Sequence, residues 1–246
     1  MFTAWVIEDA RIPAIVAALA ASWLAAAAPG APRTAEALSQ LCNARDWAAC
    51  EELAARLVLG ESMAADAAAA ARIYSRACDA GRAGACTSLG FLHETGRGVA
   101  RDAAQAIALY ARACGHGDWR GCEGLGRACE RGDTAACGQA GRAFEQGDDA
   151  RAPDFPRAAH FYTKDCNAGG ATSCLALAIL YDSGQGVIKN LATAAAFYGR
   201  ACDGGNAQGC RSLALLHETG EGVETSAERA AELMRRACAL GDRDSC

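Results

Sequence analysis

Apolar and polar positions along this chain recur with a period of about 36 residues. Each unit has a Leu-Gly or Leu-Ala pair within an apolar segment, as in residues 88–92 (SLGFL) and 212–216 (SLALL). A Gly-x-Gly-Val segment follows, at 96–99, 184–187 and 220–223, where glycines can adopt positive φ. A second apolar segment then ends four residues before a cysteine, at Tyr74, Tyr110, Tyr162, Tyr198 and Met234. This pattern predicts pairs of helices that repeat along a solenoid.

Cysteines mark the boundaries of these units, because all fourteen fall in seven Cys-x7-Cys pairs. Residues eight apart in one helix are separated by about 12 Å along its axis, whereas a disulfide needs Cα atoms within roughly 7 Å. Each pair is therefore expected to bridge a turn between two helices. The pairs are Cys42/Cys50, Cys78/Cys86, Cys114/Cys122, Cys129/Cys137, Cys166/Cys174, Cys202/Cys210 and Cys238/Cys246.

Residues between the paired cysteines support this turn. Six units have glycine three residues after the first cysteine, a position suited to a left-handed helix end: Gly81, Gly117, Gly132, Gly169, Gly205 and Gly241. Five units continue with a residue that can cap the next helix: Asp46, Asp118, Asp133, Asn206 and Asp242. Zinc is the competing interpretation of paired cysteines, but zinc sites use closely spaced C-x2-4-C pairs, which this chain lacks. Disulfides are favoured, and they indicate an oxidising compartment.

One unit is irregular. The first cysteines of successive pairs are separated by 36, 36, 15, 37, 36 and 36 residues. Only six residues lie between Cys122 and Cys129, so the glycine loop and most of a helix pair are missing. We expect one short helix to contain both cysteines. The sequence therefore predicts a truncated repeat near 122–137, with a kink or shift of the solenoid.

Composition favours an all-α fold. Hydrophobic residues make up 52% of the chain, but many are alanine and aromatics are only 6%, which suits closely packed helices. The net charge of −5 provides no basic surface of the kind that binds nucleic acid, so no nucleic-acid partner is expected.

The N-terminal segment is typical of a secretory signal peptide. Residues 12–28 are uncharged and rich in alanine, and small residues follow. Glu8 and Asp9 replace the usual positive charges, and a membrane anchor is the alternative, although seventeen residues interrupted by Pro13 are short for spanning a bilayer. We expect residues 1–30 to be a cleaved signal peptide, residues 31–246 to form the solenoid, and the mature protein to be secreted or periplasmic without stable membrane insertion.

The LG, GxGV and Tyr-x3-Cys-x7-Cys motifs, in one register, resemble the Sel1-like repeat family, which is related to TPR repeats. The paired cysteines resemble its cysteine-rich branch, typified by the Helicobacter cysteine-rich proteins. The resemblance covers about residues 33–246. It implies a right-handed superhelix of α/α hairpins, one disulfide per repeat, and a concave face formed mainly by first helices.

This geometry places a set of candidate binding residues on the first helices. If Leu89 and Leu92 are buried, the opposite side of the same helix presents one apolar residue flanked by polar ones. Such a pattern suits a groove that binds a protein or peptide. An alternative stays open, in which the apolar members pack against the neighbouring repeat. The candidates are Thr87, Phe91, Glu94, Ile179, Asp182, Arg211, Leu215 and Glu218, with Leu175 at the position of Thr87.

The sequence offers little evidence for catalysis. His93 and His217 stand where another repeat has Tyr181, which indicates packing rather than general-base chemistry. Neither lysine completes a Ser-x-x-Lys motif, and nucleophile-elbow, zinc-protease and P-loop motifs are absent from the sequence. We expect a binding scaffold without a cofactor or bound metal. The resemblance alone implies the alternative, a weak β-lactamase or penicillin-binding hydrolase that would take a β-lactam or a peptidoglycan fragment.

Overall fold

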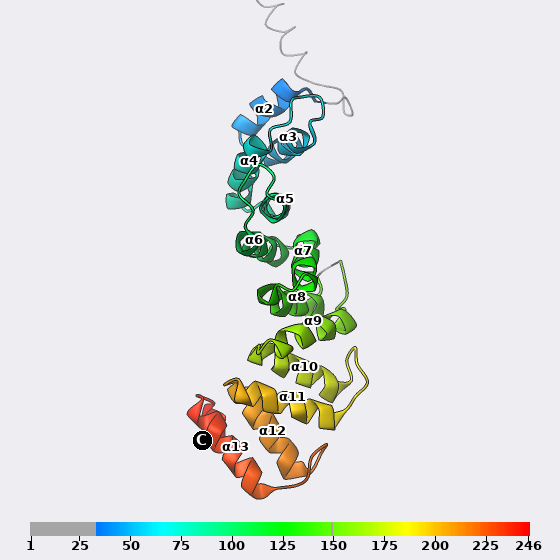
Figure 1. Ribbon diagram of the computed structural model, residues 1–246, viewed down its shortest axis with the longest axis vertical. Coiled ribbons are helices and arrows are strands. Elements are labelled where there is room, and N and C mark those ends of the chain that lie inside the picture. Colours follow the sequence, from blue (N-terminus) through cyan, green and yellow to red (C-terminus); the bar gives the residue numbers. More distant parts are fainter. Residues whose placement is uncertain (1–32, 149) are drawn as a thin grey trace, which may run out of the picture.

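The computed structural model describes residues 33–148 and 150–246, which form an elongated stack of helices (Figure 1). The predicted signal peptide, residues 1–30, lies outside the described residues. Within the described part there are twelve α-helices, a terminal 3₁₀ helix (η1, Arg243–Ser245) and no strand element. The helices are Ala35–Asn43 (α2), Trp47–Leu59 (α3), Ala67–Asp79 (α4), Ala83–Thr95 (α5), Ala103–Gly115 (α6), Trp119–Glu130 (α7), Thr134–Gln146 (α8), Phe155–Asn167 (α9), Ala171–Ser183 (α10), Leu191–Asp203 (α11), Ala207–Thr219 (α12) and Ala227–Ala239 (α13). The chain is an α/α solenoid.

The turns between helices follow from residues that the sequence analysis singled out. All six predicted glycines have positive φ, between 82° and 98°, and Arg45 takes a similar conformation in the first unit. Asp133 differs from the prediction, because its side chain accepts no capping hydrogen bond. The other four predicted caps accept hydrogen bonds from backbone N–H groups: Asp46, Asp118, Asn206 and Asp242. Positive φ, more than side-chain capping, is therefore common to these turns.

Each Cys-x7-Cys pair forms a disulfide across its turn, as the sequence predicts, and no cysteine is free. The chain-entropy model assigns about 2–3 kcal/mol of stabilisation to a bridge that closes so short a loop. The disulfides fix each turn locally, so other contacts must connect one repeat to the next. The Cα separations are 4.6 Å for Cys42–Cys50, 4.7 Å for Cys78–Cys86, 4.8 Å for Cys114–Cys122, 4.7 Å for Cys129–Cys137, 4.7 Å for Cys166–Cys174, 4.5 Å for Cys202–Cys210 and 5.0 Å for Cys238–Cys246.

A basic residue two positions before the cysteine connects successive repeats. Arg112 of α6 donates a hydrogen bond to the carbonyl of Cys78 at the end of α4, at 2.8 Å. Arg200 of α11 and Arg236 of α13 make the equivalent bonds to the carbonyls two helices earlier, at 2.6 and 2.9 Å. Each bond adds a cationic donor to a carbonyl at the C-terminal end of a helix, which also accepts the backbone N–H of the turn glycine. The second helices of successive repeats are thereby joined.

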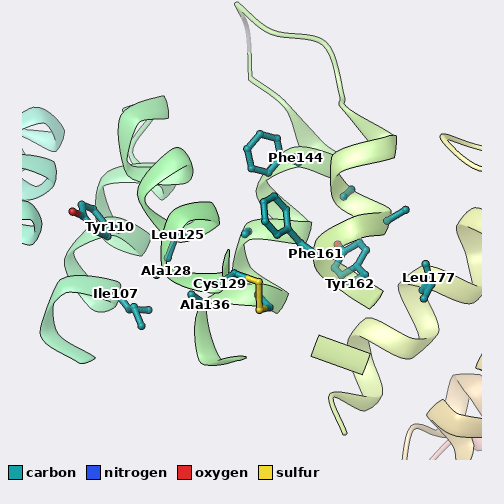
Figure 2. Packing of buried hydrophobic residues seen from close by; sticks show 14 of the residues in the cluster. Ile107, Tyr110, Leu125, Ala128, Cys129, Ala136, Phe144, Phe161, Tyr162 and Leu177 are labelled. Carbon is teal, nitrogen blue, oxygen red and sulfur yellow. A yellow bond between two sulfur atoms is a disulfide. The ribbon is translucent and has the colours of Figure 1, made fainter. Parts of the chain in front are cut away.

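The single helix α7 replaces a helix pair in the middle of the stack. It contains both Cys122 and Cys129, as expected, and is bonded through them to both neighbouring turns. A continuous buried cluster runs from α6 through α7 to α10 (Figure 2). Phe144 is fully buried there, with the Trp119 ring edge-on at 5.0 Å and the Phe161 ring at 5.3 Å between centroids. Aromatic packing thus fills the junction between the two halves.

Because α7 is one helix rather than two, the layers of the solenoid exchange roles at this point. Alternate helices lie side by side: α5 contacts α7, α7 contacts α9, α6 contacts α8, and α8 contacts α10. The first helices α3 and α5 therefore share a layer with the second helices α9, α11 and α13. An ion pair also links α9 to α7 within this layer, because Lys164 of α9 pairs with Glu130 at the end of α7 at 2.7 Å. The first helices α8, α10 and α12 continue the other layer.

Candidate functional site

A hollow of about 550 Å³ opens along the first helices of the N-terminal half. We call it the α3/α5/α7 groove, after the helices that form its walls. Its lining is mainly apolar at the α3 and α5 walls and charged at the α7 wall. The lining residues are Ala55, Val58, Leu59, Tyr74, Thr87, Ser88, Phe91, Leu92, Tyr110, Arg120, Glu123 and Arg127.

One repeat position supplies the middle of each wall. Five residues after the second cysteine of a pair stand Ala55 on α3, Phe91 on α5 and Arg127 on α7. On α5, Leu89 and Leu92 are buried in the core, so the opposite side of the helix faces out. Phe91 consequently remains 45% exposed in the groove. Successive repeats thus place different chemistry at equivalent points of one surface.

Tyrosines from the second helices form the floor of the groove. Tyr74 and Tyr110 are buried, and the Tyr110 hydroxyl donates a hydrogen bond to Glu94. Burial, with the hydrogen bond to Glu94, raises the pKa of Tyr110. Burial also raises the pKa of Tyr74. Both hydroxyls therefore stay protonated at neutral pH, and the floor carries no tyrosinate charge.

The C-terminal half repeats this tyrosine–carboxylate contact. Tyr162 donates to Glu145 at 2.6 Å, and Tyr198 donates to Asp182 at 3.2 Å. Glu94, Glu145 and Asp182 stand eight residues after the second cysteine of their pairs. The contact therefore belongs to the repeat itself, and it fixes the two helices of a hairpin.

Ion pairs hold the charged rim of the groove. Asp118 accepts hydrogen bonds from Arg120 at 2.9 and 3.0 Å and from Thr87 at 2.7 Å. Burial tends to raise the pKa of Asp118, but these hydrogen bonds outweigh it and leave the pKa lowered. Glu123 accepts two bonds from Arg157 at 3.0 and 2.9 Å, which lower the pKa of Glu123. Both carboxylates are ionised at neutral pH and already engaged within the protein.

The structure places the predicted residues of the N-terminal half in two environments. Thr87 and Phe91 line the groove. Glu94 does not, because it accepts the Tyr110 hydroxyl and pairs with Arg131 at 2.7 Å beside a separate hollow. Its position is explained by the contact between helices.

The predicted residues of the C-terminal half lie on α10 and α12, in the other layer. Ile179 and Leu215 are 38% and 46% exposed, so like Phe91 they are partly open to solvent, and the alternative in which they pack against the neighbouring repeat stays open. Arg211 pairs with Asp242 and Asp244, each at 3.4 Å. Of the remaining residues, Asp182 accepts a hydrogen bond from Tyr198. Leu175 is buried and Glu218 is exposed. The eight predicted residues therefore do not form one site.

The paired cysteines differ from the other predicted site residues, because most of them lie in the core rather than on a surface. The second cysteines of five pairs are at most 2% exposed: Cys50, Cys86, Cys137, Cys174 and Cys210. Each is bridged to a first cysteine that is also buried: Cys42, Cys78, Cys129, Cys166 and Cys202 respectively. These sulfur atoms are enclosed by the helix pair that they join, so they are not available to a ligand. Their part is structural, and they do not belong to a binding or catalytic site.

Sequence reasoning missed part of the α3/α5/α7 groove. Leu59, which is 63% exposed, and the charged residues Arg120 and Arg127 were not among the candidates. Arg127 carries a signal that could have identified it, because it occupies the repeat position of Phe91. The irregular cysteine spacing around α7 obscures this equivalence, which is seen only when sequence positions are counted from Cys122.

Other polar groups of the described residues show no arrangement of a catalytic or metal centre. Within that part of the chain, no group of three or more His, Cys, Asp or Glu side chains is placed to hold a metal ion. His217 contacts the backbone carbonyl of Glu224 at 2.9 Å, a structural bond. Ser88 of the groove donates to the carbonyl of Gly84 at 3.0 Å. These contacts give no support to a hydrolase.

A family model named Sel1 repeat matches the chain five times, at residues 47–81, 83–118, 134–169, 171–206 and 207–242. The chain belongs to the Sel1 repeat family. Residues 119–133, which contain α7, fall between two matched Sel1 repeats. The family model and the layer exchange thus identify the same segment as additional to the repeat pattern.

Solved structures of similar proteins include other Sel1 repeat proteins. A protective antigen of uropathogenic Escherichia coli strains, described as displaying an SLR fold, is 25% identical, with a TM-score of 0.50 over 87% of this chain and 50% of that one. The present chain thus spans half the length of the antigen chain. Cysteine-rich protein B of Helicobacter pylori is 25% identical over 59% of this chain and 93% of its own, with a TM-score of 0.38.

A Sel1 repeat protein from Oxalobacter formigenes is 21% identical, with a TM-score of 0.43 over 82% of this chain and 90% of that one. A search among curated proteins gives no match. The similarity to the Escherichia coli antigen supports the fold, and the chemistry of the groove has to be argued from its own residues.

Proposed function

We propose that this Sel1 repeat protein is a scaffold that binds a protein or peptide segment in the α3/α5/α7 groove. The observation that carries the proposal is the exposed Phe91 within a hollow of about 550 Å³. A half-exposed aromatic side chain between two further walls is the kind of anchor on which peptide recognition depends. Repeats of this type generally mediate protein interactions, which agrees with the proposal.

We further propose that the protein works outside the cytoplasm, secreted or in a periplasm. Seven disulfides in a chain without a free cysteine support an oxidising compartment. Among the described residues, no helix is both long and apolar enough to cross a bilayer. The apolar N-terminal segment, residues 12–28, supports export through a signal peptide. Sequencing the N-terminus of the mature protein from its native cells tests this, and a mature N-terminus near Ala31 is expected.

The binding proposal is tested with a displayed library of random linear peptides. The oxidised protein is expected to enrich peptides whose affinity falls at least about tenfold in the Phe91→Ser variant, because an anchoring aromatic residue contributes about 2 kcal/mol or more. Ile188→Ser is the matched control, since Ile188 is 90% exposed in a loop outside the groove. Enriched peptides that bind the wild type and Phe91→Ser equally would contradict the proposal.

A further inference from the structure

At the α7 wall of the groove, positively charged side chains outnumber the carboxylates. Glu123 and Asp118 each accept two bonds from an arginine, Arg157 and Arg120 respectively. The carboxylates that border the groove are therefore neutralised by cations of the chain itself. Any further cation on this wall is available to a ligand.

Arg127 is that cation. It is exposed, and none of the ion pairs within the described residues includes it. Its guanidinium carbon lies 6.0 Å from the centre of the Tyr110 ring, so the side chain extends over the floor of the groove. The charge of Arg127 contributes to lowering the pKa of Glu123, one turn earlier, but the ion pair of Glu123 is with Arg157. A guanidinium positioned in this way suits a carboxylate, which it can bind through two parallel hydrogen bonds.

Apolar surface faces Arg127 across the groove. Phe91 of α5 and Leu59 of α3 are both exposed on the walls, and Val58 adjoins Leu59 in the lining. An apolar side chain of a ligand would be removed from water there, and this removal favours binding. The groove thus offers two kinds of contact at different points along its length.

We propose that the α3/α5/α7 groove binds an acidic-apolar peptide, whose apolar side chain lies against Phe91 and Leu59 and whose carboxylate pairs with Arg127. This inference rests on the proposed function and adds the chemistry of the partner to it. Adjacent helices pack about 8–10 Å apart, and an extended peptide advances about 3.3 Å per residue. Since α5 contacts α7 directly, the acidic residue stands about three positions from the apolar residue.

The test uses the peptides enriched from the random library. We expect them to share an Asp or Glu about three positions from an aromatic or aliphatic residue. A synthetic peptide of the shared sequence is then titrated against wild type, Arg127→Gln and Arg142→Gln by fluorescence polarisation. Arg142 is the matched control, because it holds the same repeat position on α8, in the other layer. Arg127→Gln is expected to weaken binding about tenfold, and Arg142→Gln to leave it unchanged.

A charge exchange completes the test. The Arg127→Glu variant should reject the acidic peptide and recover binding when the peptide acid is replaced by lysine. Phe91-dependent peptides that contain no acidic residue, or whose affinity is the same for wild type and Arg127→Gln, would overturn this inference and leave the groove proposal intact. A library that gives no Phe91-dependent peptide would overturn both. The exposure of Arg127 keeps its substitution away from the core, and circular dichroism checks the fold.

Discussion

The two halves of the molecule use the same repeat positions on different sides of the stack. In the N-terminal half, the position five residues after the second cysteine puts Phe91 and Arg127 into the α3/α5/α7 groove. In the C-terminal half, the same position puts Ile179 and Leu215 on α10 and α12, in the layer that continues α6 and α8. Equivalent sequence positions therefore do not share a surface across α7.

The difference arises from one helix and one turn. Removing residues 119–133 from the sequence would leave seven residues between Cys114 and Cys137, which restores the regular Cys-x7-Cys unit. The additional segment thus preserves the disulfide pattern on both sides while it adds an odd number of helices. An odd number reverses the alternation of first and second helices, whereas a complete repeat would preserve it.

Alkaline pH should destabilise both halves through their tyrosines. Burial and the charge of Asp182 raise the pKa of Tyr198 to about 12, whereas an unfolded tyrosine titrates near about 10. The stabilisation that comes with this raised pKa is fully present below a pH of about 10 and is lost as the pH rises towards about 12. Over that interval the free energy of unfolding should fall by about 3 kcal/mol. Guanidinium unfolding at successive pH values measures it. Tyr198→Phe should show a smaller loss over that interval, and an equal loss would exclude Tyr198 as the cause.

Disulfides at α7 and at the C-terminus should differ in what they support. Replacing either Cys114 and Cys122 or Cys238 and Cys246 by alanine should lower the free energy of unfolding by about 2–3 kcal/mol, because both bridges close loops of equal length. Only the first pair holds α7, which forms one wall of the groove, against α6. Peptide affinity, measured by fluorescence polarisation, should therefore fall for the first variant alone. Equal affinities in the two variants would show that the groove does not depend on this bridge.

The tyrosine–carboxylate bond should contribute similarly in the two halves. Tyr110→Phe and Tyr198→Phe each leave a carboxylate without its hydroxyl donor, so each should lower the free energy of unfolding by about 1 kcal/mol at neutral pH. Glu94 keeps its partner Arg131 in the first variant, which should make that loss the smaller one. Urea unfolding distinguishes the two values. A larger loss for Tyr110→Phe would contradict this ranking.

Polar substitutions on the two exposed surfaces should have the smallest effect on stability. Phe91→Ser and Leu215→Ser change side chains that are about half exposed, so each should alter the free energy of unfolding by no more than about 0.5 kcal/mol. Their effects on peptide binding should nevertheless differ, with a loss for Phe91→Ser alone. A destabilisation of several kcal/mol in either variant would mean that the side chain packs between repeats.

Much of the fold follows from local sequence signals. Glycine three residues after a cysteine, and cysteines too far apart for one helix, determine the turns and their disulfides without long-range information. The capping pattern was equally local, although Asp133 does not bond as predicted. The layer exchange is different, because it depends on counting helices across the whole chain. The sequence signal for the layer exchange is that only six residues separate Cys122 from Cys129, which leaves space for one helix rather than two.

The site was less predictable for a related reason. Helix periodicity correctly identified the outward side of α5, and with it Thr87 and Phe91. It could not show that Glu94 is bonded to Tyr110, because that contact depends on the approach of a second helix. It also could not join Phe91 to Leu59 and Arg127, which are 32 and 36 positions away in the sequence and meet only in the packed solenoid.

A crystal structure of the variant that lacks residues 119–133 tests the role of α7 most directly. We predict a disulfide between Cys114 and Cys137, with α8 beside α5, so that Phe91 and Ile179 lie in the same layer. Peptide binding that depends on Arg127 should be lost, because that residue is removed with the helix. A structure in which Cys114 and Cys137 pair but α8 makes no contact with α5, with Phe91 and Ile179 in different layers, would contradict this role of α7.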